Sequence, residues 1–514
     1  MQELNRTRNT KRNIVWGFAN RAVTILGPFV TRTFLIQCLG IDYLGINTLY
    51  VSIMQILSLA ELGFATAVVY GMYKPVAEGD IRQVAAYLNF FKSVYRWVGL
   101  IILVAGLVLM PFLGYLVTGS WPDDVGMQAA FAIYLVNTVI SYFLYAYKQS
   151  LLNAYQRNDA VSKVNLAFML AQYALQVGVL VVWPNFYAYA VVYPVCTIGS
   201  NVAAALATRR LLPEFSDRSL GSEKLSGERR AAIRKQVAGL LFQQICYVTR
   251  NSFSSMAISM FIGIAAVACY DNYFVIMNGL NAFLTVLGTS MTAAVGNSVA
   301  VESKEKNFND LRLFVFLYSL LSIGVAASLI SVYQPFMRIW VGDELMLGFE
   351  IPVLMTLYFY VRTMGDMRAV YVNATGIWWE QRWRALFEGI GNLVLNFTLV
   401  QFFGVAGVVM GSLISLFFLN FVYGSHLAFK FYFGLDKARL YYIDHLIYLG
   451  VGALVCVTTY AIVSFIPEGG LVMFCAKLAA AIVCAGALLL LAFFWTKRFK
   501  NAFRFVKRAV FKKG

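Results

Sequence analysis

The sequence has few residues of the kinds that carry most enzyme chemistry. Only two histidines, His426 and His445, occur in 514 residues, and no H-E-x-x-H, G-x-S-x-G, G-x-G-x-x-G or P-loop motif is found. The seven cysteines form no C-x-x-C pair, which argues against a disulfide framework and against a zinc site. The sequence therefore predicts no catalytic residues and no metal site, and we expect a protein that is not an enzyme.

Charged residues are also scarce. They make up 13% of the chain, whereas 60% of residues are hydrophobic and the mean hydropathy is +0.68. Soluble domains have about 25% charged and about 45–50% apolar residues. The composition therefore predicts a polytopic membrane protein.

Long apolar segments repeat along the whole chain. Because a helix needs about 20 apolar residues to cross a bilayer, we predict an all-α protein with about fourteen transmembrane helices. The predicted spans are 13–38, 46–70, 94–117, 129–147, 163–183, 186–206, 237–262, 271–299, 312–333, 352–374, 385–403, 405–429, 444–465 and 472–496.

A net charge of +17 would be compatible with binding to nucleic acid, but the positions of the Lys and Arg residues along the chain argue against it. The Lys and Arg residues lie in alternate connectors, and the opposite connectors contain Arg338 alone. This asymmetry is the positive-inside pattern. It predicts an even number of spans with both termini in the cytoplasm, and no nucleic-acid partner.

The longest polar break, 209–236, divides the predicted spans into two groups of six, with two more at the end. A weak repeat at an offset of 223 residues pairs Gly40 with Gly263 and Tyr50 with Tyr273, which fits parallel repeats. We predict an N-lobe, a basic cytoplasmic linker, a C-lobe, two further spans and a basic amphipathic tail that lies on anionic membrane lipids. Their respective ranges are 1–208, 209–236, 237–430, 431–496 and 497–514.

The first predicted span carries ionisable residues where the bilayer core would be. Arg21, Pro28 and Arg32 fall on one helical face. A charge at mid-bilayer costs about 2.5–3.5 kcal/mol on the mildest scale, so such residues normally face a bundle interior or a wet cavity. This face is a candidate wall of a transport path.

Most other intramembrane charges have a candidate structural partner. Glu61 is predicted at a similar depth to Arg21, which leaves a structural ion pair open, and Arg362 and Asp366 are four residues apart and would neutralise each other. Arg384 and Glu388 are predicted to form an exposed pair near the inner surface. Arg250, in contrast, has no acid on its own span. Arginines at several depths suit an anionic headgroup, because guanidinium binds phosphate bidentately and stays charged.

Several motifs around these residues resemble the polysaccharide flippases of the multidrug/oligosaccharidyl-lipid/polysaccharide (MOP) exporter superfamily. In the first two spans they are Asn13-Ile-Val-Trp-Gly-Phe, Pro28-Phe-Val-Thr-Arg32-Thr, Leu39-Gly-Ile-Asp-Tyr-Leu-Gly45, Leu59-Ala-Glu-Leu-Gly-Phe64 and Tyr70-Gly-Met-Tyr-Lys-Pro75. Further on they are Phe261-Ile-Gly263, Tyr270-Asp-Asn-Tyr273, Gly296-Asn297 and Val301-Glu302.

The resemblance implies a flippase of the bacterial inner membrane for O-antigen or capsule repeat units. It implies two six-helix lobes around a central cavity and a polyprenyl-pyrophosphate-linked glycan as the substrate, moved by alternating access. It implies no cofactor beyond a coupling ion, Na⁺ or H⁺, and a polymerase or chain-length regulator of the same pathway as partners. The implied substrate-binding residues are Arg21, Arg32 and Arg250, and the cavity or coupling candidates are Glu61, Asp271, Arg362, Asp366 and Arg368.

Two other functions stay open at this point. One is a cation-coupled exporter of drugs or small solutes in the same superfamily, which a cavity rich in arginine disfavours because it repels cations. The other is a membrane polysaccharide polymerase or ligase. Such enzymes usually have a sizeable outer loop, but the longest predicted outer connector here is 334–351.

Overall fold

The chain folds entirely into helices over the residues that the structure describes. The computed structural model describes residues 6–61, 64–144 and 147–511, although some side chains within these ranges, among them that of Arg250, are not described. No β-strand occurs in these ranges. The described residues of each predicted span lie mostly in helices, and among the described residues seven helices are long and apolar enough to cross a membrane by themselves, or eight with one bent pair. The protein is an all-α polytopic membrane protein.

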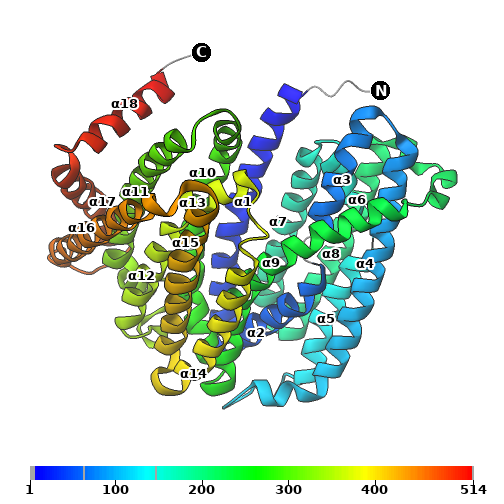
Figure 1. Cartoon of the computed structure of the whole chain (residues 1–514). Helices are drawn as coiled ribbons and strands as arrows, with labels where there is room; N and C mark the ends of the chain where they lie inside the picture. Colours follow the sequence, from blue (N-terminus) through cyan, green and yellow to red (C-terminus); the bar gives the residue numbers. More distant parts are fainter. Residues whose placement is uncertain (1–5, 62–63, 145–146, 512–514) are drawn as a thin grey trace. The chain divides into compact units, whose positions relative to one another are not determined.

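The chain forms two compact units that divide between Ala268 and Cys269. In the first unit, short 3₁₀ helices follow α2, α4 and α8. Figure 1 labels the longer helices of the chain. Its helices are α1 (Arg6–Cys38), α2 (Ile41–Leu57), η1 (Ser58–Glu61), α3 (Phe64–Glu78), α4 (Ile81–Leu109), η2 (Met110–Leu116), α5 (Met127–Phe143), α6 (Tyr147–Ala154), α7 (Asn158–Val182), α8 (Phe186–Leu211), η3 (Pro213–Ser216), η4 (Arg218–Ser222) and α9 (Gly227–Phe261).

The second unit takes most of α10 and all later helices. Two π-helical stretches, η6 and η7, interrupt its middle part. Its helices are α10 (Ile264–Val301), α11 (Lys304–Val341), η5 (Asp343–Leu345), α12 (Glu350–Met364), α13 (Asp366–Thr375), α14 (Arg382–Ser415), η6 (Leu416–Tyr423), α15 (Gly424–Ala428), η7 (Phe429–Phe433), η8 (Leu435–Lys437), α16 (Ala438–Ser464), α17 (Leu471–Phe493) and α18 (Lys497–Phe511).

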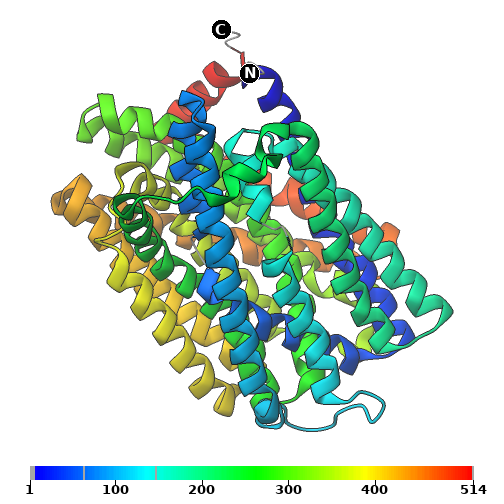
Figure 2. The same cartoon turned by 90° about the vertical axis from the view of Figure 1, so that its right-hand side faces the viewer.

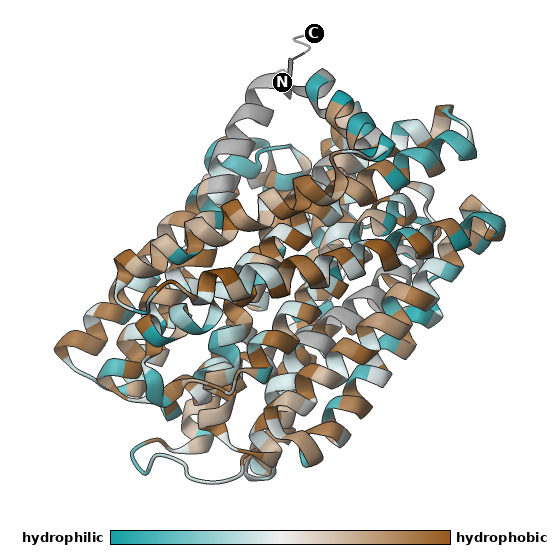
Figure 3. Cartoon of the chain, turned by 90° about the vertical axis from the view of Figure 1, so that its left-hand side faces the viewer, coloured by the Kyte–Doolittle hydropathy of each residue, from teal (hydrophilic) through white to brown (hydrophobic). Residues whose placement is uncertain are grey.

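Short polar side chains mark the start of several long helices. Asp80 caps α4 by accepting the Gln83 amide at 3.0 Å, and Asn185 caps α8 by accepting the Ala188 amide at 3.0 Å. Such caps satisfy amide groups that have no partner within the helix. Figure 3 shows apolar residues along most of the length of the long helices. The helix ends are thus specified locally, while the helix bodies are suited to a membrane.

In the first unit, α7 packs between α1 and α8, and α5 packs between α8 and α4 (Figure 2). Two glycines allow close approach to α7. A Cβ at Gly27 would lie 1.9 Å from the Tyr173 ring, and one at Gly199 would lie 2.3 Å from the Phe168 ring. Because lipid gives helices no hydrophobic reason to associate, close packing at small residues is a main source of stability between them.

In the second unit, α14 consists of two helices that meet at a sharp turn. Gly404 adopts a φ of 56° there, a conformation that glycine takes without steric cost. The turn agrees with the predicted boundary between spans 385–403 and 405–429. A Cβ at Gly407 would lie 2.1 Å from the Leu399 carbonyl oxygen, so the two arms of this hairpin touch through backbone.

Several predicted boundaries differ from the structure, and three of them show why. The span predicted over 46–70 is broken, because α2 ends at Leu57 and η1 follows it. The span predicted over 352–374 is divided at Gly365 between α12 and α13. Helix α9 begins at Gly227, within the predicted linker, because Ser226 provides a cap through the Arg229 amide.

Candidate functional site

The two arginines of α1 lie in different surroundings. Arg21 is exposed, and among the described residues no carboxylate lies within 4.0 Å of its guanidinium. Arg32 is half-buried and is engaged in a polar interaction. It also lies close enough to Tyr189 of α8 for the two side chains to interact electrostatically. Eleven residues on a helix span about 16 Å, so the two cations lie at clearly different depths.

The Arg250 side chain lies outside the described residues, so its predicted role stays a prediction; its backbone belongs to α9.

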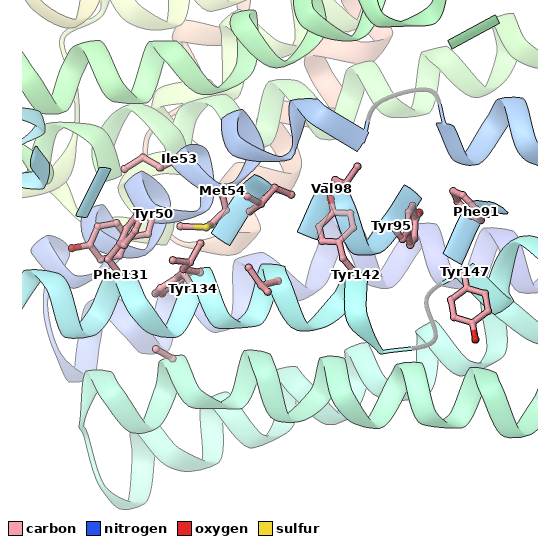
Figure 4. Packing of buried hydrophobic residues seen from close by; sticks show 14 of the residues in the cluster. Tyr50, Ile53, Met54, Phe91, Tyr95, Val98, Phe131, Tyr134, Tyr142 and Tyr147 are labelled. Atoms are coloured by element: carbon pink, nitrogen blue, oxygen red, sulfur yellow. The ribbon is translucent and has the colours of Figure 1, made fainter. Parts of the chain in front are cut away.

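Glu61 is held by tyrosines, not by an arginine. Its Oε2 accepts the Tyr142 hydroxyl at 2.5 Å, and its Oε1 accepts the Tyr95 hydroxyl. These two rings lie 5.4 Å apart, centroid to centroid, within the buried cluster shown in Figure 4. The ion pair between Glu61 and Arg21 that the sequence left open does not form. The carboxylate is therefore stabilised by neutral donors, which are compatible with either of its protonation states.

In the second unit, Arg362 and Asp366 each have a neutral hydrogen-bond partner on another helix. The Tyr318 hydroxyl donates to Asp366 Oδ2 at 2.8 Å, and Arg362 Nη1 donates to Asn278 Oδ1 at 3.4 Å. The break at Gly365 places the two residues on different helices, α12 and α13. Asp271, on α10, is half-buried and engaged in a polar interaction.

Arg368 is 4% exposed and binds the π-helical stretch η6. Its Nη1 donates to the Asn420 carbonyl at 2.6 Å, and its Nη2 donates to Asn420 Oδ1 at 3.1 Å. The Asn420 side chain in turn donates to Glu388 Oε2 at 2.8 Å. Glu388 also accepts from Arg384 at 2.6 Å. The predicted pair is therefore present, but it is buried, with exposed side-chain fractions of 11% and 2%, so the prediction of an exposed pair was wrong.

A polar pocket of about 400 Å³ lies between α1, α7 and α8, within the first unit. We call it the α1–α7–α8 pocket. No charged side chain lines it, and seven of its ten lining residues are neutral and polar. The lining residues are Asn20, Thr24, Asn165, Phe168, Met169, Gln172, Cys196, Thr197, Ser200 and Asn201.

The pocket belongs to a polar face that runs along α8. Towards the start of the helix, Tyr193 donates to Asn47 Oδ1 at 3.2 Å, and Tyr134 of α5 donates to the same atom at 2.7 Å. Within the pocket, Thr197 donates to Asn137 Oδ1 at 2.7 Å. The opposite face of α8 is apolar and exposed, and it comprises Val191, Val195, Ile198, Val202 and Leu206. The polar face is thus directed away from lipid.

Reasoning from sequence missed this pocket because it considered only ionisable residues. A signal was available. Asn165, Gln172 and Gln176 recur at helical spacing on one predicted span, and Thr197 and Asn201 do so on the next. Neutral polar residues with this period indicate a face that packs against other helices, because Ser, Thr, Asn and Gln side chains hydrogen-bond across helices in membranes.

The described residues contain no group of three or more His, Cys, Asp or Glu side chains that could hold a metal ion.

Of three comparisons with known proteins, only the one with solved structures finds matches. No family model and no curated protein matches the chain. Among solved structures, lipid II flippase MurJ in an inward closed conformation matches with a TM-score of 0.62 and 14% identity, over 94% of this chain and 99% of that one. An inward-facing multidrug resistance MATE family transporter of the MOP superfamily matches with a TM-score of 0.58 and 14% identity, over 80% of this chain and 98% of that one.

A third structure, the Vibrio cholerae MATE transporter VcmN, matches with a TM-score of 0.53 and 14% identity, over 85% of this chain and 99% of that one. At these identities the likeness concerns the fold. The chain therefore has the fold shared by lipid II flippase MurJ and the MATE transporters of the MOP superfamily.

Proposed function

We propose that this protein is a flippase that moves a polyprenyl-pyrophosphate-linked oligosaccharide from the cytoplasmic to the outer leaflet. The oligosaccharide would be the repeat unit of an O-antigen or of a capsular or exopolysaccharide. The observation that carries the proposal is the match to a lipid II flippase over 94% of the chain, against 80% and 85% for the two MATE structures named above. The fold of a protein that flips a lipid-linked sugar thus accounts for more of this chain.

The chemistry of the helices suits the parts of such a substrate. Arg21 offers an exposed guanidinium for the pyrophosphate, with Arg32 at a second depth. In the second unit, a cavity of about 330 Å³ between α11, α12 and α16 is lined almost wholly by apolar side chains, which suits a polyprenyl chain. Arg250 belongs to the proposed substrate-binding set on sequence grounds alone.

Net movement of substrate against a gradient would need a source of energy, and we propose coupling to Na⁺ or H⁺. Glu61 between two tyrosine hydroxyls is the best-placed carboxylate for this in the first unit. Asp271, Arg362 and Asp366 are candidates in the second. Arg368 is the weakest candidate, because its contacts with Asn420 and η6 already serve the fold.

The proposed location is the bacterial inner membrane, with both termini in the cytoplasm, as the distribution of Lys and Arg indicates. The basic helix α18 would then lie at an anionic leaflet, where the exposed Phe503 would enter the headgroup region. A polymerase or a chain-length regulator of the same pathway is a proposed partner.

A cation-coupled multidrug exporter is the second candidate function, favoured by the two MATE structures. Arg21 and Arg32 on α1 disfavour it, because they would repel a cationic drug. Expression in a drug-sensitive host separates the two functions, because only the exporter would raise resistance.

Deleting the gene from its host should trap the lipid-linked repeat unit on the cytoplasmic leaflet. We expect this intermediate to accumulate and to resist oxidation by periodate, which does not cross membranes, when it is added to intact spheroplasts. Restoring the gene should make the glycan reactive. An intermediate that accumulates already exposed to periodate would contradict the proposal and would point to a missing polymerase or ligase.

A further inference from the structure

We infer that the α1–α7–α8 pocket binds the neutral sugar part of the lipid-linked substrate, through hydroxyl and amide groups. The inference rests on the proposed function and adds a specific site to it. It concerns residues of the first unit only, none of which the sequence had singled out.

The composition of the pocket selects the class of ligand. Asn and Gln side chains both donate and accept hydrogen bonds, and Thr and Ser hydroxyls do the same. Such groups match the hydroxyl and acetamido groups of sugars. Cation sites usually include at least one carboxylate ligand, and none lines this pocket. Its volume of about 400 Å³ lies in the range of small-molecule pockets and exceeds what one water needs.

Asn201 supplies independent evidence that something polar enters. Its side chain is 5% exposed, yet its Nδ2 has no hydrogen-bond partner among the described residues. An amide donor that is buried without a partner costs about 1–3 kcal/mol, so proteins rarely keep one without a ligand or an ordered water. A ligand acceptor in the pocket would satisfy this donor.

The position of the pocket connects it with the proposed pyrophosphate contact. Arg21 is adjacent in sequence to Asn20, which lines the pocket, and it is exposed. Asn165 lies seven residues from the start of α7, about 10 Å along the helix. With the predicted orientation, the pocket lies in the cytoplasmic half of the membrane. When a substrate enters from the cytoplasm, its glycan would contact the pocket and its phosphates would contact Arg21.

The test compares two probes on the full-length protein in lipid nanodiscs. One probe is undecaprenyl pyrophosphate without sugar, and the other is the undecaprenyl-pyrophosphate-linked repeat unit extracted from the host. The wild-type protein should bind the glycosylated probe at least about tenfold more tightly. In Asn201→Leu this preference should fall by about five- to tenfold, as expected for one lost hydrogen bond to a sugar, while binding of the bare lipid is unchanged.

Two further variants tie the effect to the amide donor of Asn201. Val202→Leu, on the exposed apolar face of α8, should keep the wild-type preference. Asn201→Asp keeps the shape of the side chain but removes the amide donor, so the preference should fall as in Asn201→Leu. If a cation occupies the pocket instead, Asn201→Asp should strengthen thermal stabilisation by NaCl without any glycan, and that result would overturn the inference.

The same binding experiment distinguishes failure of the sugar-binding inference from failure of the proposed flippase function. If every variant prefers the glycosylated probe as the wild type does, the pocket holds only water and the inference is wrong, although the proposed function stands. If the wild-type protein binds neither probe, the proposed function itself fails.

Discussion

Replacing Arg21 with alanine is expected to reduce surface polysaccharide to less than about a tenth of its normal amount, with the protein still present in the membrane. The reason is that Arg21 is exposed and makes no ion pair with a described residue, so under the proposed function its loss would remove a contact with substrate and leave the contacts of the fold in place. A charge-assisted hydrogen bond contributes about 1.5–3 kcal/mol, which corresponds to about ten- to a hundredfold in affinity. Surface polysaccharide and membrane-protein level would both be quantified by immunoblotting.

Two control variants make this prediction specific. Arg21→Lys keeps the charge but loses the planar fork that binds phosphate bidentately, so intermediate display is expected. Arg96→Ala, on α4, removes another exposed arginine and should leave display unchanged. Normal display in Arg21→Ala would show that this guanidinium does not hold the substrate.

Replacing Asp444 with alanine is expected to destabilise the second unit by about 3 kcal/mol or more. Asp444 is 3% exposed and forms ion pairs with two arginines. Arg312 Nε donates to its Oδ2 at 2.7 Å, and Arg498 Nη2 lies 2.6 Å from its Oδ1. Removing one partner of a buried ion pair costs about 3–5 kcal/mol, because a charge stays buried without compensation. The lower figure applies here, because the Arg498 side chain is 38% exposed. The measurement is thermal unfolding of the purified protein in detergent.

The companion variants separate the two arginines. Arg498→Ala should destabilise far less, by about 1 kcal/mol, but should make α18 more sensitive to limited proteolysis, because it joins α18 to α16. Asp343→Ala, which removes an exposed carboxylate from Arg338, serves as the matched control and should have little effect on unfolding. Equal unfolding temperatures for Asp444→Ala and Asp343→Ala would contradict this account of the ion cluster.

The sequence predicted most of the fold because the dominant signals are local. Apolar length defined the spans, and the glycine at 404 lies at the predicted boundary between two of them. The breaks at Ser58 and Gly365 were missed because nothing local forbids a helix there; tertiary contacts decide them. The start of α9 was placed too late because its first turns are polar, although Ser226 carried a capping signal.

The charged residues within the predicted spans show where local reasoning ends. Arg384 and Glu388 pair as their spacing of four indicates, because one helix carries both. In contrast, the hydrogen-bond partners of Glu61 are Tyr95 and Tyr142, which lie 34 and 81 residues away in the sequence. No local sequence pattern predicts contacts over such distances. The burial of Arg368 against η6 has the same origin, because that contact spans 52 residues. Contacts between side chains that are far apart in the sequence depend on how the helices pack, so they can be identified only from the structure.

The most direct test of the central claim uses the purified protein in liposomes that contain the lipid-linked repeat unit in both leaflets. Periodate added outside reaches only outer-leaflet glycan. With the protein present, we predict that the inner-leaflet glycan also becomes oxidised, while a fluorescent phospholipid in the same vesicles keeps its leaflet. Identical oxidation in vesicles with and without the protein would contradict the account.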